Sequence, residues 1–199
     1  MIIVGAGSSG KETLGMMILQ SIPFDEIVFF DDNYKGSNLI FGKYQVITDV
    51  NKMESYINEY ADFCIAVGNP RIREKLYSKM ILWGGKAKNI ISPSSYCIST
   101  ISENGTIIQP GVSISYDFQS GKSCIIHSNS VIGHKVIIGD FVNISPLVSI
   151  VGPLSIGDYS YVGAGSVILP NIKIGKNVYI SAGSVIEKDV ADFETIHRK

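Results

Sequence analysis

The C-terminal half of the chain carries an aliphatic residue at every sixth position from Ile108 to Ile186. Ile or Val occupies thirteen of these fourteen positions, and Ser120 is the one departure. The hairpins of an antiparallel sandwich would break this phase every ~8–12 residues. A fixed short period without insertions indicates a solenoid, in which each six-residue unit forms one short strand and one turn. We therefore predict a parallel β-helix with three units, or 18 residues, in each coil.

This period has geometric consequences. Residues 18 apart lie one above the other, so His134 lies beneath Gly152, and Gly152 lies beneath Pro170. Asn143 is half a coil away from His134 and can meet it only across a subunit boundary, as in a closed cyclic oligomer. Gly follows six of the fourteen positions in this six-residue register, where we expect a corner that needs a permissive backbone.

The N-terminal half alternates apolar strands with helical segments, which predicts a small α/β domain with a parallel sheet. The boundary is placed at Ser92-Pro93-Ser94, so that residues 1–92 form this domain and residues 93–199 form the β-helix. The predicted strands are Met1–Val4, Glu26–Phe30, Phe63–Val67 and, less clearly, Lys88–Ile91, and the predicted helices are Thr13–Gln20, Asp49–Tyr60 and Arg71–Met80.

Three clusters follow the predicted strands. The first has the pattern G-x-G-x-x-G from Gly5 to Gly10, between a strand and a helix, where backbone N–H groups can face a phosphate. Asp31-Asp32 follows the second strand, where dinucleotide-binding proteins hold a ribose, and Gly68-Asn69-Pro70 follows the third. About 90 residues suffice for one mononucleotide half, which favours a nucleotide or a nucleotide-linked substrate over NAD. The alternative is that these clusters are structural turns.

Composition narrows the function classes. The net charge is −1 with no basic block, which argues against binding to nucleic acid. No apolar run approaches the ~20 residues of a membrane span, and Met1 leads directly into a strand rather than a signal peptide, so we expect a cytoplasmic protein. The three cysteines lack a zinc or disulfide pattern, which predicts free, mostly buried thiols and no metal site.

Six motifs lie along almost the whole chain: the glycine turn continued by Lys11-Glu12, Asp31-Asp32, Val67-Gly68-Asn69, Val131-Ile132-Gly133-His134, Ile138–Pro146 and Gly163–Pro170. In order and spacing they resemble those of bacterial sugar acetyltransferases of the hexapeptide-repeat superfamily. That family pairs an N-terminal nucleotide-sugar-binding domain with a left-handed β-helix, and it includes N-acetyltransferases for nucleotide-linked 4-amino-sugars and the sialic acid O-acetyltransferase type.

The resemblance implies roles for individual residues. His134 matches the catalytic base, and Gly152 matches a backbone N–H near the thioester. The positions that match the acetyl-CoA site are Asn143, Gly152, Ala164 and Ala182, and those that match the site for the nucleotide part are Gly7, Ser8, Ser9, Asp31, Asp32 and Gly68. The family assembles as trimers with active sites at subunit interfaces.

Three positions depart from the family. Lys135 follows the catalytic histidine where an acid is common, and Asn143 stands where a second histidine is common. Ser9, in the glycine turn, also stands at a position where the family often has a histidine. Loss of the acid removes a group that would orient His134. These departures leave the reaction class intact and the exact acceptor open.

We therefore expect acetyl transfer from acetyl-CoA to the amine of a UDP-, dTDP- or GDP-linked 4-amino-sugar in surface glycan biosynthesis, with His134 as general base and no metal. The alternatives are an O-acetyltransferase for a sialic acid or polysaccharide hydroxyl and a non-enzymatic nucleotide-sugar-binding scaffold. Among the other candidates, His127 is expected to face outward from the β-helix, and His197 lies in the tail. Arg71 and Arg73 are expected to be solvated helix charges.

Overall fold

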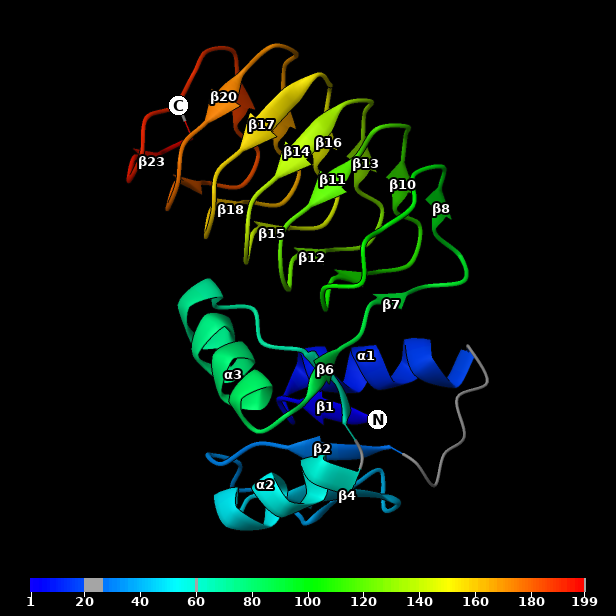
Figure 1. Ribbon diagram of the computed structural model, residues 1–199. Coiled ribbons are helices and arrows are strands. Elements are labelled where there is room, and N and C mark those ends of the chain that lie inside the picture. Colours follow the sequence, from blue (N-terminus) through cyan, green and yellow to red (C-terminus); the bar gives the residue numbers. More distant parts are fainter. Residues whose placement is uncertain (20–26, 60, 199) are drawn as a thin grey trace.

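A computed structural model describes residues 1–19, 27–59 and 61–198. It has an α/β domain at one end and a long β-helix packed on it (Figure 1). The predicted positions Gln20, Glu26 and Tyr60 lie outside the described residues. No helix in the described part is long and apolar enough to cross a membrane.

The α/β domain contains a six-stranded sheet in the order β3-β4-β2-β1-β5-β6, in which only β3 and β4 pair antiparallel. The strand predicted at Lys88–Ile91 exists in part, because Ile90 and Ile91 form a strand, but this strand pairs into the β-helix. The strand beside β5 at the edge of the α/β sheet is β6 instead. The strands are β1 (Ile2–Val4), β2 (Val28–Phe30), β3 (Leu39–Ile40), β4 (Tyr44–Ile47), β5 (Asp62–Ile65) and β6 (Lys86–Ala87).

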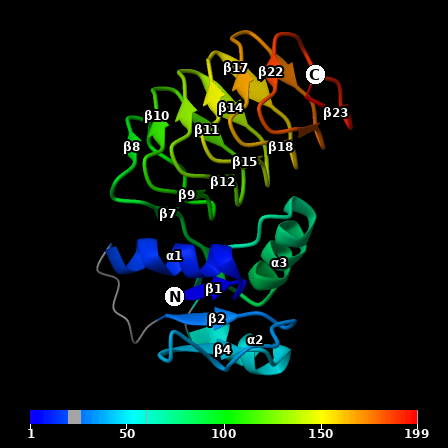
Figure 2. The ribbon, with the colours of Figure 1, turned by 180° about the vertical axis from the view of Figure 1, so that it is seen from behind.

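Three helices cover this sheet: α1 (Ser8–Leu19), α2 (Val50–Glu59) and α3 (Pro70–Leu82). The side chain of Asn69 caps α3 by accepting from two backbone N–H groups, and Pro70 occupies the first turn. Buried strand residues alternate between the two faces, so Ile3 packs with α1 while Ile2 packs with α2. Figures 1 and 2 show α1 and α3 on the side of the domain that meets the β-helix.

The β-helix consists of three parallel sheets whose strands recur every six residues. Paired residues are 18 apart in the interior coils, as in Ile132↔Ile150, and 17 or 16 apart in the first and last coils. The three sheets are β7 (Ile90–Ile91), β9 (Ile107–Ile108), β12 (Ile125–Ile126), β15 (Asn143–Ile144), β18 (Tyr161–Val162), β21 (Tyr179–Ile180) and β23 (Thr195–Ile196); β8 (Tyr96–Cys97), β10 (Ser113–Ile114), β13 (Val131–Ile132), β16 (Ser149–Ile150), β19 (Val167–Ile168) and β22 (Val185–Ile186); and β11 (Gln119–Ser120), β14 (Val136–Ile138), β17 (Leu154–Ile156) and β20 (Lys173–Ile174).

The predicted aliphatic columns fill the interior. All thirteen aliphatic register positions are buried, and they form one continuous core from Ile108 to Ile186. Ser120 ends β11, the first strand of its sheet, and pairs with Ile138 of the next coil. The register therefore holds at Ser120 although the residue is polar.

The expected role of the glycines that follow the aliphatic positions is wrong. The left-handed backbone of each corner falls two residues later, on residues such as Ser123, Lys135 and Phe141. The glycines are needed instead because neighbouring coils approach closely. A Cβ on Gly133 would lie 2.6 Å from the N of Gly152, and the same holds for Gly163 beneath Ala182, at 2.5 Å.

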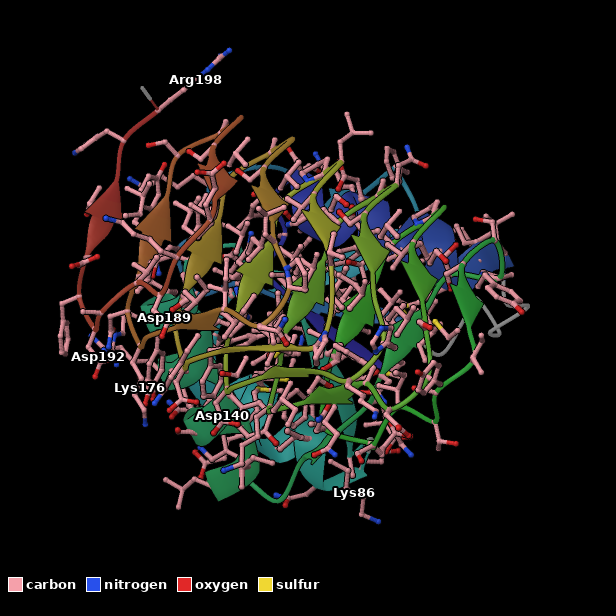
Figure 3. All side chains as sticks on the ribbon, turned by 90° about the horizontal axis from the view of Figure 1, so that it is seen from above. Lys86, Asp140, Lys176, Asp189, Asp192 and Arg198 are labelled. Atoms are coloured by element: carbon pink, nitrogen blue, oxygen red, sulfur yellow. The ribbon has the colours of Figure 1, made fainter. Side chains whose placement is uncertain are left out.

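Acidic side chains connect successive coils along one corner of the β-helix (Figure 3). Asp140 accepts from the N–H of Lys122, and Asp158 accepts from the N–H of Asp140. Asp192 accepts from the N–H of Lys176 in the same way. These carboxylates have backbone partners, so we assign them a structural role.

Candidate functional site

A cavity of about 760 Å³ lies between the α/β domain and the sheet that contains β12 and β15. It brings together three of the predicted site residues, namely Ser9, Gly68 and Asn143. The rest of its wall is Glu12, Gly15, Met16 and Leu19 from α1, and Gln109, Pro110, His127, Ser128, Ser145, Pro146 and Tyr161 from the β-helix.

The glycine turn forms one end of this region. Gly5 has a φ of +105°, which favours glycine, and a Cβ on Gly10 would lie 2.0 Å from the carbonyl oxygen of Gly5. Gly7 faces open space, which leaves the backbone at the start of α1 accessible. The turn thus has the geometry that a phosphate requires at a helix N-terminus.

The two predicted acids have different surroundings. The Asp31 carboxylate accepts from the Ala6 N–H at 3.0 Å and so fixes the glycine turn to the end of β2. Asp32 forms a 3.5 Å ion pair with Lys79 of α3, and both side chains are about one-third exposed. Asp31 therefore shapes the turn, whereas Asp32 lies in a more accessible position.

A chain of polar contacts crosses the cavity from one domain to the other. Gln109 donates from Nε2 to Glu12 Oε2 at 3.2 Å, and its Oε1 accepts from the N–H of Ser128 and is 3.1 Å from His127 Nδ1. Because an amide Oε1 only accepts, His127 carries its proton on Nδ1 and leaves Nε2 as an acceptor. Burial lowers the pKa of His127, which favours this neutral form.

His127 does face outward from the β-helix, as expected, but it faces the cavity rather than solvent. The six-residue register predicts that the His127 side chain points outward. It could not show that α1 covers it, because Glu12 and Gln109 are 97 residues apart. Glu12, Gln109 and His127 are thus wall residues that sequence reasoning did not assign to the site.

Asn143 is buried beside His127, whose pKa its side chain acts to raise, yet its Oδ1 makes no hydrogen bond of normal geometry among the described residues. It begins β15, and Tyr161 lies directly above it in the next coil. A buried acceptor without a partner is costly unless a ligand or water supplies a donor. Asn143 therefore has the environment of a ligand contact.

His134 is not part of the cavity wall. It follows β13, on a different sheet from Asn143, so one protomer does not bring the two together. Its ring stacks on that of Tyr116 with centroids 5.3 Å apart, and its Nδ1 is buried without a partner in the described chain. The carbonyl of His134 lies against Gly152, as the period of 18 predicts.

Ala164 and Ala182 are exposed and lie in adjacent coils, where the N–H of Gly183 donates to the Ala164 carbonyl at 2.8 Å. The coil below contributes Pro146, whose carbonyl accepts from the N–H of Gly165. Pro146 also lines the cavity. Ala164 and Ala182 therefore continue from Pro146 in a row along the β-helix from the cavity, whereas Gly152 lies on another corner, above His134.

The expectation that Arg73 is a solvated charge is wrong. Its side chain is completely buried between the two domains, where its N–H groups donate to backbone carbonyls of the α/β domain and of the β-helix. Arg71 is exposed, and its guanidinium lies 3.8 Å from the ring centroid of Tyr159. Within the described residues, no group of three or more His, Cys, Asp or Glu side chains is placed to hold a metal ion.

Comparisons with known proteins agree with this architecture. Residues 1–80 match the family model of the PglD N-terminal domain, and residues 153–188 match that of the bacterial transferase hexapeptide with six repeats. GDP-perosamine N-acetyltransferase from Escherichia coli O157:H7 is 32% identical over 171 residues, which cover 83% of this chain and 76% of that protein.

Solved structures of acetyltransferases share this two-domain fold over nearly the whole chain. The acetyltransferase domain of PglB from Neisseria gonorrhoeae, in complex with acetyl coenzyme A, is 28% identical with a TM-score of 0.81 and covers 98% of this chain and 93% of that chain. PerB from Caulobacter crescentus, in complex with CoA and GDP-perosamine, is 24% identical with a TM-score of 0.85 over 96% of this chain and 90% of that chain. The latter likeness supports the fold alone.

Proposed function

Because the chain belongs to the family of hexapeptide-repeat sugar N-acetyltransferases, with a left-handed β-helix as its C-terminal domain, we propose that it acetylates the amine of a nucleotide-linked 4-amino-sugar with acetyl-CoA. The observation that carries the proposal is the cavity between the two domains. It has the glycine turn and Gly68 on one side and the unpartnered acceptor of Asn143 on the other.

The α/β domain would hold the nucleotide part. The N-terminus of α1, with Gly7, Ser8 and Ser9, offers backbone N–H groups to the phosphates. Asp32 and Gly68 would contact the remainder, and Asp31 would keep the turn in place through Ala6. A nucleotide held at this point extends its sugar toward the β-helix.

The β-helix would supply the chemistry. His134 takes the proton from the amine as the nitrogen attacks the thioester carbon, so that a C–N bond forms, the C–S bond breaks, and the CoA sulfur receives a proton. The N–H of Gly152 makes no hydrogen bond within the described chain, and it would donate to the oxyanion that develops. Asn143, Ala164 and Ala182 would position acetyl-CoA, and no covalent intermediate is required.

A homotrimer would complete the site. His134 of one protomer and Asn143 of the next would meet across the interface, because they lie on different sheets of the same prism. Exposed apolar side chains surround the column that contains His134 and Gly152: Val131 is 51% exposed, Val151 42% and Leu169 36%. A second copy of the chain would bury them.

The direct test is to incubate the protein with acetyl-CoA and UDP-, dTDP- and GDP-linked 4-amino-sugars and to detect an added acetyl group by mass. We expect one nucleotide class to be acetylated and His134→Ala to lower kcat by ~10²–10⁴-fold. Acetylation of free sialic acid but of no amino-sugar would contradict the proposal and favour an O-acetyltransferase.

Subunit mixing tests the shared site. His134→Ala and Asn143→Ala homotrimers should both be impaired, whereas a trimer that contains both variants has one of its three interfaces intact. A random equimolar mixture, in which about three quarters of the trimers are mixed, should therefore regain about a quarter of wild-type activity. Absence of recovery in verified mixed trimers would place both residues in a single protomer's site.

A further inference from the structure

Arg73 of α3 crosses the boundary between the two domains, where α3 lies beside the β-helix (Figures 1 and 2). Its side chain has no exposed surface. Each of its five N–H groups has a backbone carbonyl to donate to. Nε donates to Ser123 at 2.7 Å, Nη1 to Val67 at 2.8 Å and Gly68 at 2.9 Å, and Nη2 to Phe141 at 2.6 Å and Val142 at 3.2 Å.

These carbonyls belong to both walls of the cavity. Val67 and Gly68 follow β5, and Gly68 lines the cavity from the α/β domain. Phe141 and Val142 directly precede Asn143, which lines it from the β-helix. One planar group therefore fixes the distance between the two walls.

Stability alone does not explain this residue. Arg73 forms no ion pair among the described residues, and burial lowers its pKa to about 10, which still leaves it charged at neutral pH. A buried charge is expensive, and a well-packed apolar side chain often stabilises a protein as well or better. What an apolar residue or a lysine lacks is five coplanar donors in a rigid fork.

We propose that Arg73 is a positioning residue for acetyl transfer, which holds the loop at Gly68 in register with the β-helix at Asn143. The proposal rests on the function proposed above. Each domain would retain its own binding site without Arg73. The two substrates would then bind normally but meet in the wrong geometry, and a misplacement of ~1 Å can cost ~10²-fold in rate.

The first test compares Arg73→Lys with Lys75→Ala, an exposed position on the same helix that serves as control. We expect Arg73→Lys to lower kcat by about tenfold or more, while the dissociation constants of CoA and of the nucleoside diphosphate stay within about twofold of wild type. Wild-type kcat in Arg73→Lys would overturn the proposal. So would a fall in kcat that merely parallels weaker binding of both ligands.

Chemical rescue covers the case in which a variant is destabilised. Methylguanidinium should restore kcat in Arg73→Ala, because it returns the planar donors to the vacated space, whereas methylammonium at the same concentration should not. Equal effects of the two cations, or none from either, would assign Arg73 a purely structural role.

Hydrogen exchange separates this proposal from the proposed function. Without substrates, the amides of residues 66–69 and 141–145 should exchange faster in Arg73→Ala and slow again with methylguanidinium. If wild-type protein acetylates no amino-sugar, the proposed function fails, but this measurement still decides whether Arg73 holds the two walls together. Unchanged exchange in Arg73→Ala would show that it does not.

Discussion

The carbonyl oxygen of His134 lies so close beneath Gly152 that a Cβ on the glycine would be 1.8 Å from it. We therefore expect Gly152→Ala to push the two coils apart, to cost about 1–3 kcal/mol of unfolding free energy, and to lower kcat at the same time. Chemical denaturation and the acetyl-transfer assay measure the two effects. Gly15→Ala, inside α1 where a Cβ meets nothing within 4 Å, should keep or raise the stability because Ala favours a helix; since Gly15 lines the cavity, it is a control for stability alone. Wild-type stability in Gly152→Ala would contradict the close stacking of these coils.

The ring of Tyr116 packs against His134, and we expect it to orient the imidazole where a hydrogen-bonding acid is missing. The two rings are stacked with an interplanar angle of 8°, and no described residue bonds to His134 Nδ1. Stacking of aromatic rings is worth about 0.5–1.5 kcal/mol, so Tyr116→Ala should lower kcat by up to about tenfold. Tyr116→Phe keeps the ring and should keep kcat. If the Phe variant loses as much activity as the Ala variant, the hydroxyl matters and the ring stack does not orient His134.

The register of the β-helix and the contact of His134 with Gly152 could be predicted because stacking repeats a local pattern. A residue's coil, face and vertical neighbour follow from counting by six and 18, and the pairing Ile132↔Ile150 confirms the count. The role of the glycines was missed because the count does not distinguish a left-handed φ from a close approach. The placement of Asn143 beside His134 across a trimer interface stays a prediction.

What the sequence could not show is how the two domains dock. No period relates Glu12 to Gln109, or Arg73 to Phe141, which is 68 residues away. These contacts depend on how α1 and α3 lie against the sheet of β12 and β15. The sequence predicts a solvated Arg73 because a charge on a helix is usually exposed, and only tertiary contacts reveal that it is buried.

The low pKa of His127 predicts a pH-dependent stability. Burial is the main cause, Asn143 and Glu12 oppose it, and Arg73 adds to it. The unfolded state then binds a proton that the folded state resists, so stability is lost as pH falls through the ordinary histidine pKa of ~6.5 toward the lower folded value.

We expect unfolding free energies between about pH 7.5 and 5.5 to fall less in His127→Gln than in wild type, because the variant lacks this proton uptake. His197→Gln removes an exposed imidazole from the tail and should leave the wild-type slope unchanged. Identical slopes in wild type and His127→Gln would mean that His127 is solvated.

The three thiols should differ in reactivity. Cys64 and Cys124 are fully buried, and burial raises the pKa of each to about 12, whereas Cys97 is half-buried at the start of the β-helix. Native protein should therefore react with a chromogenic disulfide reagent at one thiol, and denatured protein at all three. Cys97→Ser should abolish the native signal. A remaining native signal would show that the sheet of the α/β domain opens readily at Cys64, or that the β-helix does so at Cys124.

The departure at Ser120 can be turned into a test of the whole register. Its Oγ is buried without a hydrogen-bond partner in the described chain, in a column that is otherwise aliphatic. Removing an unsatisfied hydroxyl relieves a desolvation cost, so Ser120→Ala should raise the unfolding free energy by about 1 kcal/mol. Ser130→Ala is the matched control with the opposite sign, because Ser130 Oγ donates to the Ser145 carbonyl at 2.9 Å and accepts from the N–H of Val148. If both variants lost the same stability in urea denaturation, the Ser120 hydroxyl would be satisfied, and the core would not be apolar at that level of the β-helix.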